Sequence, residues 1–215
     1  MSRIALDRWQ AAQSAEFSHH QDLRLEAYST ASNIIAKYLG FDYENDFKDK
    51  VIVEVGAGPR GSILNTKGNF KRGLVVEPLI DRWPPEIRKD YEDIGVEIID
   101  AAYEDLDIDE QVDETWFFNV VQHVFDPKEQ LELAKKTSKA VRVFESIGSV
   151  TDTAHPHFIT PETFTDVLGN FGKIYKGGSE PGFHGADCYY GTWNESDLLC
   201  LASTEPFEST SSSAA

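Results

Sequence analysis

The stretch Val51-Ile52-Val53-Glu54-Val55-Gly56-Ala57-Gly58-Pro59-Arg60-Gly61 decides the fold. Its first five residues are mostly β-branched and predict a buried strand, and the glycines that follow predict a tight turn. Pro59 suits the first turn of a helix, because its fixed φ and missing N–H cost nothing there. In open α/β sheets, a glycine turn at the carboxyl end of a strand lets a ligand approach the backbone closely. The stretch therefore predicts a ligand-binding turn at that edge of a sheet.

Short apolar runs alternate with polar, helix-prone segments along the rest of the chain. The predicted strands are Val51–Val55, Gly73–Glu77, Val96–Asp100, Thr115–Val120, Val141–Ser146, Lys173–Lys176 and Asp197–Ala202. The predicted helices are Gly61–Asn69, Asp81–Ile94, Pro127–Lys139 and Pro161–Asn170. Apolar strands alternating with helices predict a Rossmann-like, doubly wound α/β sheet of seven mostly parallel strands. We expect residues 178–193, which are rich in aromatic side chains, to form a long loop or an extra hairpin.

The 215 residues are enough for one domain. Apolar residues recur at near-helical spacing over the first forty residues, which end at Gly40 and predict helices. We therefore expect a single domain over residues 1–204, with a helical cap at 1–40 and an α/β core at 50–204. Residues 205–215 are rich in Ser, Thr and Ala and predict a disordered tail.

The charge of the chain limits the partners that it can bind. It has 37 acidic and 20 basic residues, a formal charge of −17, whereas nucleic acids and anionic membranes attract clustered cations. No apolar run approaches the roughly 18 residues of a membrane span, and the N-terminus lacks the apolar core of a signal peptide. Two cysteines, Cys188 and Cys200, make no disulfide framework. We therefore expect a protein of the reducing cytoplasm.

Glu54 separates the two cofactors that the glycine turn suits. Gly56, Gly58 and Gly61 satisfy the G-x-G-x-x-G spacing of dinucleotide sites. A carboxylate two residues before the first glycine would repel a pyrophosphate, whereas S-adenosylmethionine (SAM) has no phosphate and carries a cationic sulfonium and ammonium. Glu77 ends the next predicted strand, where its carboxylate can accept hydrogen bonds from both ribose hydroxyls of either cofactor. The two acids together favour SAM.

The order of an acid, an apolar residue and Gly-x-Gly resembles that of class I SAM-dependent methyltransferases, particularly the small-molecule group related to the ubiquinone-biosynthesis methyltransferases. The resemblance covers about residues 50–147, and Arg60 stands where a third glycine often falls in that family. It implies that the turn cradles the methionine part of the cofactor and that the acid of the second strand holds the ribose. The residues implied are Glu54, Gly56, Ala57, Gly58, Glu77 and Pro78.

The same resemblance implies cofactor contacts after the third and fourth predicted strands. Asp100 matches the acid that meets the adenine amino group, with Ala101 and Ala102 beside it, and an alternative register on Ala102-Tyr103-Glu104 stays open. Asn119 and Val120 would flank the cofactor at the end of the fourth strand. His123 would then face the transferred methyl group.

Methyl transfer to a hydroxyl or an ammonium requires the loss of a proton, and histidine is the simplest base near neutral pH. His123 is the candidate catalytic base, and a helix-start histidine bonded to the backbone is an equal alternative. The candidate substrate-binding residues are Trp9, His19, His155, His157, Tyr189 and Tyr190. For Tyr189 and Tyr190, ordinary packing in a hairpin is the alternative. Since no metal-ligand spacing is defined, we expect no metal site.

The sequence thus predicts an enzyme that transfers a methyl group from SAM to an oxygen or nitrogen of a small-molecule acceptor. Two other functions stay open. One is a catalytically silent SAM-binding protein, or an acidic surface that docks a basic partner. The other is an NAD(P)-dependent oxidoreductase that uses the glycine turn. A homodimer also stays open as an oligomeric state.

Overall fold

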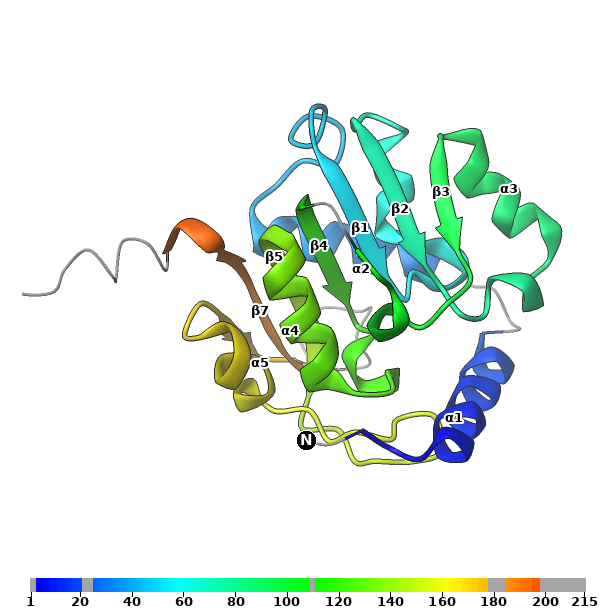
Figure 1. The fold of residues 1–215 in the computed structure, drawn as a ribbon, viewed down its shortest axis with the longest axis vertical. Coiled ribbons are helices and arrows are strands. Elements are labelled where there is room, and N and C mark those ends of the chain that lie inside the picture. Colours follow the sequence, from blue (N-terminus) through cyan, green and yellow to red (C-terminus); the bar gives the residue numbers. More distant parts are fainter. Residues whose placement is uncertain (1–2, 21–24, 109–110, 178–184, 198–215) are drawn as a thin grey trace, which may run out of the picture.

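The computed structural model describes residues 3–20, 25–108, 111–177 and 185–197. A seven-stranded sheet in the order β3-β2-β1-β4-β5-β7-β6 forms its centre (Figure 1). The strands are β1 (Val51–Val55), β2 (Arg72–Val76), β3 (Val96–Ile99), β4 (Val112–Phe118), β5 (Ser138–Ile147), β6 (Lys173–Tyr175) and β7 (Asp187–Asn194). Strands β1 to β5 pair in parallel, and β7 runs antiparallel to both β5 and β6. The predicted Rossmann-like sheet is confirmed.

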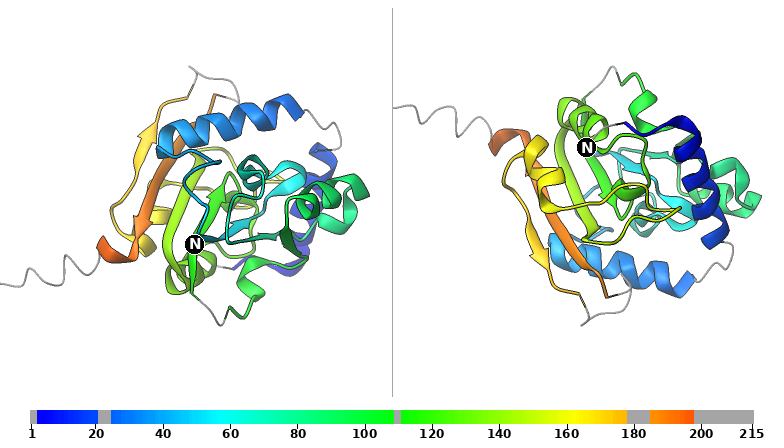
Figure 2. Two further views of the ribbon diagram at one scale, coloured as in Figure 1. Left: turned by 90° about the horizontal axis from the view of Figure 1, so that it is seen from above. Right: turned by 90° about the horizontal axis from the view of Figure 1, so that it is seen from below.

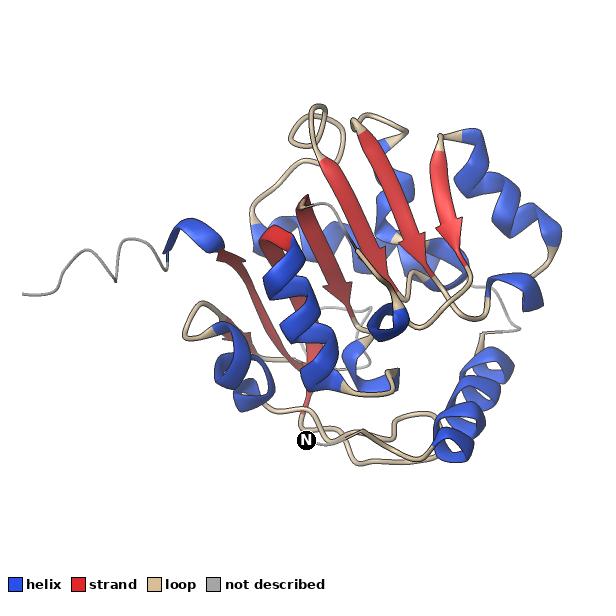
Figure 3. Cartoon of the chain, viewed as in Figure 1, coloured by secondary structure: helices blue, strands red, loops and turns tan. Residues whose placement is uncertain are grey.

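Helices cover both faces of this sheet. The α-helices are α1 (Leu6–His19), α2 (Leu25–Leu39), α3 (Pro85–Asp93), α4 (Pro127–Thr137) and α5 (Pro161–Leu168). Helices α4 and α5 lie in front of the sheet in Figure 1 and α2 lies behind it, as the views from above and below in Figure 2 show. Helix α1 stands beyond the edge at which the parallel strands end. The predicted N-terminal helices are therefore present, with α1 as a cap over that edge (Figure 3).

The alternation of side chains along each strand divides the core between the two faces. Val53 of β1 belongs to a buried cluster on one face that also contains Leu131 of α4 and Phe164 of α5. Its neighbour Ile52 packs with Trp116 of β4 in a cluster on the opposite face. Because both faces are covered, the parallel strands are mostly apolar rather than regularly alternating with polar residues, which is the pattern that made them recognisable in the sequence.

The segment after the glycine turn differs from the prediction. Residues 61–69 do not form an α-helix; the chain forms two short 3-10 helices instead, η1 (Gly58–Arg60) and η2 (Ser62–Thr66). Gly61 between them is extended, with φ −59° and ψ 153°. The backbone N–H groups of Ser62 and Ile63 donate to the side chain of Glu54. This carboxylate takes up the first N–H groups of η2 and fixes the short helix beside the turn.

The seventh strand also differs from the prediction. The strand that completes the sheet is β7, within the aromatic-rich segment, and it forms a hairpin with β6. The predicted strand Asp197–Ala202 lies almost wholly outside the described residues. Gly191 interrupts the aromatic pattern of β7, and a Cβ there would lie 2.8 Å from Cα of Gly172. The close passage of these two backbones explains why a glycine stands in the middle of a strand.

The outer limits of the domain remain predictions. The expected tail, residues 205–215, lies outside the described residues, and the single domain over residues 1–204 remains a prediction. Among the helices that the structure describes, none has both the length and the apolarity to span a bilayer.

Phe164 provides a test of the packing between α5 and β7. Its side chain is fully buried and stacks on Tyr189, with ring centroids 5.0 Å apart. We expect Phe164→Ala to lower the free energy of unfolding by about 3–5 kcal/mol, because it leaves a cavity in the core. Phe158→Ala is the control, since Phe158 is half exposed, and should change it by about 0.5 kcal/mol or less. Urea unfolding measures both; equal effects would contradict the packing described.

Candidate functional site

A cavity of about 1080 Å³ lies at the carboxyl ends of β1, β2 and β4, between the sheet and the N-terminal helices. Its sheet side is lined by the glycine turn, by the residues that follow β2 and by Asn119 and Val120 after β4. Its cap side is lined by α1 and α2 and by the loop after β5, with the side chains of Trp9, Glu16, His19, His20, Tyr28 and His155. The cavity therefore joins the predicted cofactor side to a substrate side built mainly from the cap.

The two glycines of the turn serve different purposes. Gly56 and Gly58 both have positive φ, 61° and 60°. A Cβ at Gly56 would lie 2.0 Å from Cγ2 of Val120, whereas a Cβ at Gly58 would meet no atom within 4 Å. Gly56 thus allows the turn to pack under the end of β4, and Gly58 leaves open space over the backbone. A ligand can lie directly against the turn at Gly58.

Glu54 lies buried beneath this turn. One carboxylate oxygen accepts from the N–H of Ser62 at 2.8 Å and the other from the N–H of Ile63 at 2.7 Å. Burial raises the pKa of Glu54 to about 7, although these hydrogen bonds favour the ionised form. Glu54 lines the cavity, and it also holds η2 in place.

Glu77 follows β2 on the other side of the turn. Its carboxylate accepts from the N–H of Gly58 at 2.7 Å and from the N–H of Leu79 at 2.8 Å. Burial raises the pKa of this carboxyl. Glu77 and Pro78 both line the cavity, at the position expected for a ribose contact.

The predicted adenine contact requires a correction. Asp100 is exposed, and neither it nor Ala101 lines the cavity. Strand β3 ends at Ile99, and the chain reaches the cavity two residues after Asp100, at Ala102, Tyr103 and Glu104. The alternative register is therefore the one that lies at the site. The carboxylate of Glu104 accepts hydrogen bonds from the N–H groups of Phe125 and Asp126, and thereby fixes the start of α4.

The end of β4 rests on a carboxyl group that the sequence analysis missed. Glu145 of β5 is fully buried, and its Oε1 accepts from the N–H groups of Val120 at 2.8 Å and Val121 at 3.2 Å. Burial raises its pKa to about 8. The only signal in the sequence was an acid within the apolar strand 141–146.

Asn119, the residue at the end of β4, has φ 61°, and its Oδ1 accepts from Ser146 Oγ at 2.8 Å.

His123 lies on the short helix η5 (Val121–His123) and is 8% exposed. Its Nδ1 lies 3.0 Å from the carbonyl oxygen of Ala154. Because a carbonyl oxygen only accepts, Nδ1 carries the hydrogen, and the lone pair of the neutral ring is on Nε2. Burial lowers the pKa of His123 and favours this neutral form. His123 is bonded to the backbone, as one predicted alternative has it, and it also lines the cavity; its role as a catalytic base remains a prediction.

Glu16 of α1 is a further site residue that the sequence analysis did not single out. One of its oxygens, Oε2, lies 3.4 Å from Nδ1 of His123, and Oε1 lies 2.5 Å from Nε2 of His20. Nδ1 of His20 in turn lies 2.5 Å from the hydroxyl of Tyr28. Burial raises the pKa of Glu16, but its interactions with the neighbouring histidines, led by the hydrogen bond with His20, outweigh burial and lower the pKa to about 2. The spacing of Glu16 and His20, one helical turn apart, was the available signal.

The other predicted substrate residues divide into two groups. Trp9, His19 and His155 line the cavity. His157, Tyr189 and Tyr190 do not, which corrects their assignment. His157 is buried and its Nε2 donates to the carbonyl of Val124 at 2.9 Å. Tyr189 and Tyr190 belong to the two faces of β7, where their rings pack against Phe164 and Phe144.

Comparison with known proteins shows which fold this is. No family model matches the chain, and no curated protein matches it. The chain is similar to the solved structure of 1,6-didemethyltoxoflavin-N1-methyltransferase of Burkholderia thailandensis, with 18% identity, a TM-score of 0.59, and coverage of 90% of this chain and 92% of that one. That structure contains 1,6-didemethyltoxoflavin and S-adenosylhomocysteine (SAH). This is the fold of class I SAM-dependent methyltransferases.

Two further solved structures have the same fold. Phosphoethanolamine N-methyltransferase 1 of Haemonchus contortus is 13% identical with a TM-score of 0.62, and the match covers 94% of this chain and 54% of that one. Geranyl diphosphate C-methyltransferase of Streptomyces coelicolor is 12% identical with a TM-score of 0.59, and the match covers 77% of this chain and 78% of that one. Two of these enzymes are named as nitrogen methyltransferases and the third as a carbon methyltransferase. The ubiquinone-related subgroup therefore stays a prediction.

Glu145 makes the stability of the fold depend on pH. Its folded pKa of about 8 exceeds its ordinary value of 4.5, so the folded state keeps a proton that the unfolded state has released between these values. Stability should therefore fall as pH rises from about 5 to 8, by about 1.4 kcal/mol per pH unit from this group. We expect Glu145→Gln to remove that part of the slope in urea unfolding. Glu132→Gln, on the surface of α4, is the control, and an unchanged slope in Glu145→Gln would contradict the assignment.

Proposed function

We propose that the protein is a SAM-dependent methyltransferase acting on an oxygen or nitrogen of a small molecule. One observation carries this proposal: the open backbone at Gly58 lies between two buried acids, Glu54 and Glu77, at the carboxyl edge of the sheet. Buried carboxylates attract a cationic ligand. The shared fold supports the proposal, since the solved structures named above contain SAH.

The hydrogen bonds of the turn favour SAM over a dinucleotide. A pyrophosphate binds to free backbone N–H groups at the N-terminus of an α-helix. Here the N–H of Gly58 donates to Glu77, that of Gly61 donates to the hydroxyl of Tyr91, and those at the start of η2 donate to Glu54. These backbone N–H groups are therefore not available to a pyrophosphate. Of the three side chains that accept from them, Glu77 and Glu54 carry carboxyl groups.

The residues around the turn fit the cofactor. When bound, SAM supplies a methyl group activated by a cationic sulfonium. We assign the methionine part to the turn Gly56-Ala57-Gly58, the ribose to Glu77 and the adenine to the backbone around Ala102, with Asn119 and Val120 beside the reacting end. Each carboxylate oxygen of Glu77 accepts one hydrogen bond within the protein and keeps a further lone pair for a ribose hydroxyl.

The cap side of the cavity suits an acceptor. Trp9 and His19 of α1 and His155 of the loop after β5 line this side and would contact the acceptor and exclude water. Transfer breaks the S–CH3 bond and forms a bond from the methyl carbon to the acceptor's oxygen or nitrogen, which must lie in line. The acceptor's proton passes to Nε2 of His123, whose Nδ1–H is held by Ala154. A reducing compartment such as the cytoplasm fits the buried Cys188, which has no disulfide partner among the residues that the structure describes.

Calorimetric titration tests this function. We expect the purified protein to bind SAM and SAH in the micromolar range and to show no binding of NAD or NADP. Glu77→Ala should weaken SAH binding by about tenfold or more, equivalent to about 1.4 kcal/mol. Glu97→Ala is the matched control, since Glu97 is an exposed acid of β3 paired with Arg72 outside the cavity.

Two results would contradict the proposal. Binding of NAD or NADP without SAH would favour the oxidoreductase. Binding of none of the four, with salt-sensitive retention on a basic protein surface, would favour the acidic interaction protein.

A further inference from the structure

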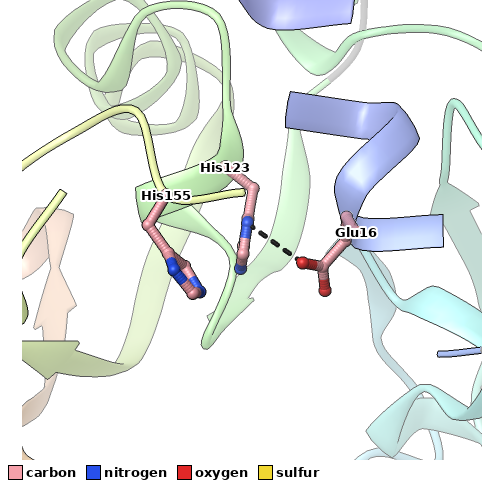
Figure 4. Close-up of side chains that lie close together, drawn as sticks. All are labelled: Glu16, His123 and His155. Carbon is pink, nitrogen blue, oxygen red and sulfur yellow. Dashed lines mark ion pairs between the residues drawn. The ribbon is translucent and has the colours of Figure 1, made fainter. Parts of the chain in front are cut away.

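Three side chains from separate segments converge on the cap side of the cavity. Glu16 comes from α1, His123 from η5 and His155 from the loop between β5 and α5. A ligand-type atom of each lies within 4.8 Å of those of the other two. Figure 4 shows the two imidazole rings side by side, with the carboxylate of Glu16 next to His123. The sequence offered no spacing for such a group, because 107 and 32 residues separate its successive members.

The hydrogen bonds of both rings leave Nε2 free. Nδ1 of His123 donates to the carbonyl of Ala154 at 3.0 Å. Nδ1 of His155 lies 3.0 Å from both carboxylate oxygens of Asp152, so it too carries the hydrogen. Histidines that bind metals almost always donate their other ring N–H to a carboxylate or a backbone carbonyl in this way. Both rings are therefore oriented as metal ligands are.

The distances allow the three donors to reach one ion. In a tetrahedral site with bonds of about 2.1 Å, ligand atoms lie about 3.4 Å apart. Oε2 of Glu16 lies 3.4 Å from Nδ1 of His123, the nitrogen that carries the hydrogen, so the carboxylate must turn toward Nε2 to share an ion with it; ligand-type atoms of the three residues lie within 4.8 Å of one another. The side chain of His155 is one-third exposed, so it has room to turn. Two neutral imidazoles and one carboxylate form a donor set that zinc, cobalt and related ions accept.

We propose that Glu16, His123 and His155 bind one divalent transition-metal ion, with at least one coordination position open to the cavity. The site goes beyond the proposed function, because binding the ion requires neither SAM nor an acceptor. It also affects that function. The lone pair on Nε2 of His123 cannot bind a metal and accept a proton together, so the ion and the acceptor's proton compete for the same atom.

Titration of the chelator-treated, full-length protein with Co²⁺ tests the site, since bound Co²⁺ absorbs visible light according to its ligands. We expect one equivalent of Co²⁺ to bind and Zn²⁺ to displace it. Glu16→Gln and His155→Asn should each weaken binding by about 100-fold or more, and Asp152→Asn, which alters only the group that orients His155, by about 10-fold. His19→Asn is the control on the same helix and should bind Co²⁺ as the wild type does.

The contrary results are distinct. No saturable binding of Co²⁺ to the wild type would overturn the proposal, as would unchanged binding in both Glu16→Gln and His155→Asn. Thermal unfolding of each variant without metal confirms that a loss of binding is not a loss of the fold. A separate titration with SAH distinguishes the two proposals. If the protein binds Co²⁺ but not SAH, the metal site stands and the methyltransferase proposal fails. If it binds SAH but not Co²⁺, the methyltransferase proposal stands and the metal site fails.

Discussion

Two buried carboxyl groups hold the turn on which the site depends. Glu54 and Glu77 together accept four backbone hydrogen bonds, from the turn, from η2 and from the segment after β2. Burial of a carboxylate is unfavourable unless such partners are present, and here it still raises both pKa values. A cationic ligand over Gly58 would lower the cost of ionising these groups. The acids thus fix the backbone and, in the proposed function, also favour a cationic ligand over it.

The cap completes the opposite wall through a separate set of polar contacts. Helix α1 is tied to η5 by the hydrogen bond from Gln13 to the carbonyl of His123 and by the contact of Glu16 with its ring. The carboxylate of Glu16 is fixed in turn by His20 and Tyr28. The position of His123 therefore depends on the docking of α1. Any acceptor must lie between this polar wall and the glycine turn.

The sequence was sufficient for the five parallel strands, because strands covered on both faces are mostly apolar and stand out between polar helices, but it missed β7. It was also sufficient for the glycine turn and for Glu77, whose positions follow from adjacent parallel strands. It failed where distant contacts decide the local structure. Glu54 takes up the N–H groups that an α-helix would have started from, and Gly191 breaks the pattern of β7 because another backbone passes beside it.

The same limit applies to individual site residues. Asp100 fitted the family pattern, but the chain turns into the cavity only at Ala102. Glu145 acts through partners 24 or more residues away along the chain, so no local motif marks it. For Glu16, only the nearby His20 was a local signal, and its contact with His123 is distant in the sequence. His157 and His155 have the same neighbour, Pro156, yet one donates to the backbone within the protein and the other lines the cavity. Only the packing of the loop after β5 decides which of the two histidines lines the cavity.

The ratio of SAM to SAH affinity, measured from pH 6 to pH 8, tests most directly whether the buried acids select a cation. The two ligands differ at the sulfur, which is cationic only in SAM. Because Glu54 has a pKa of about 7, it ionises across this range. We expect the ratio to rise about threefold to tenfold with pH, because the attraction between the ionised carboxylate and the sulfonium, partly screened by solvent, changes affinity by about that factor. The rise should be smaller in Glu54→Gln. A ratio that is independent of pH, or that changes equally in the variant, would contradict the account.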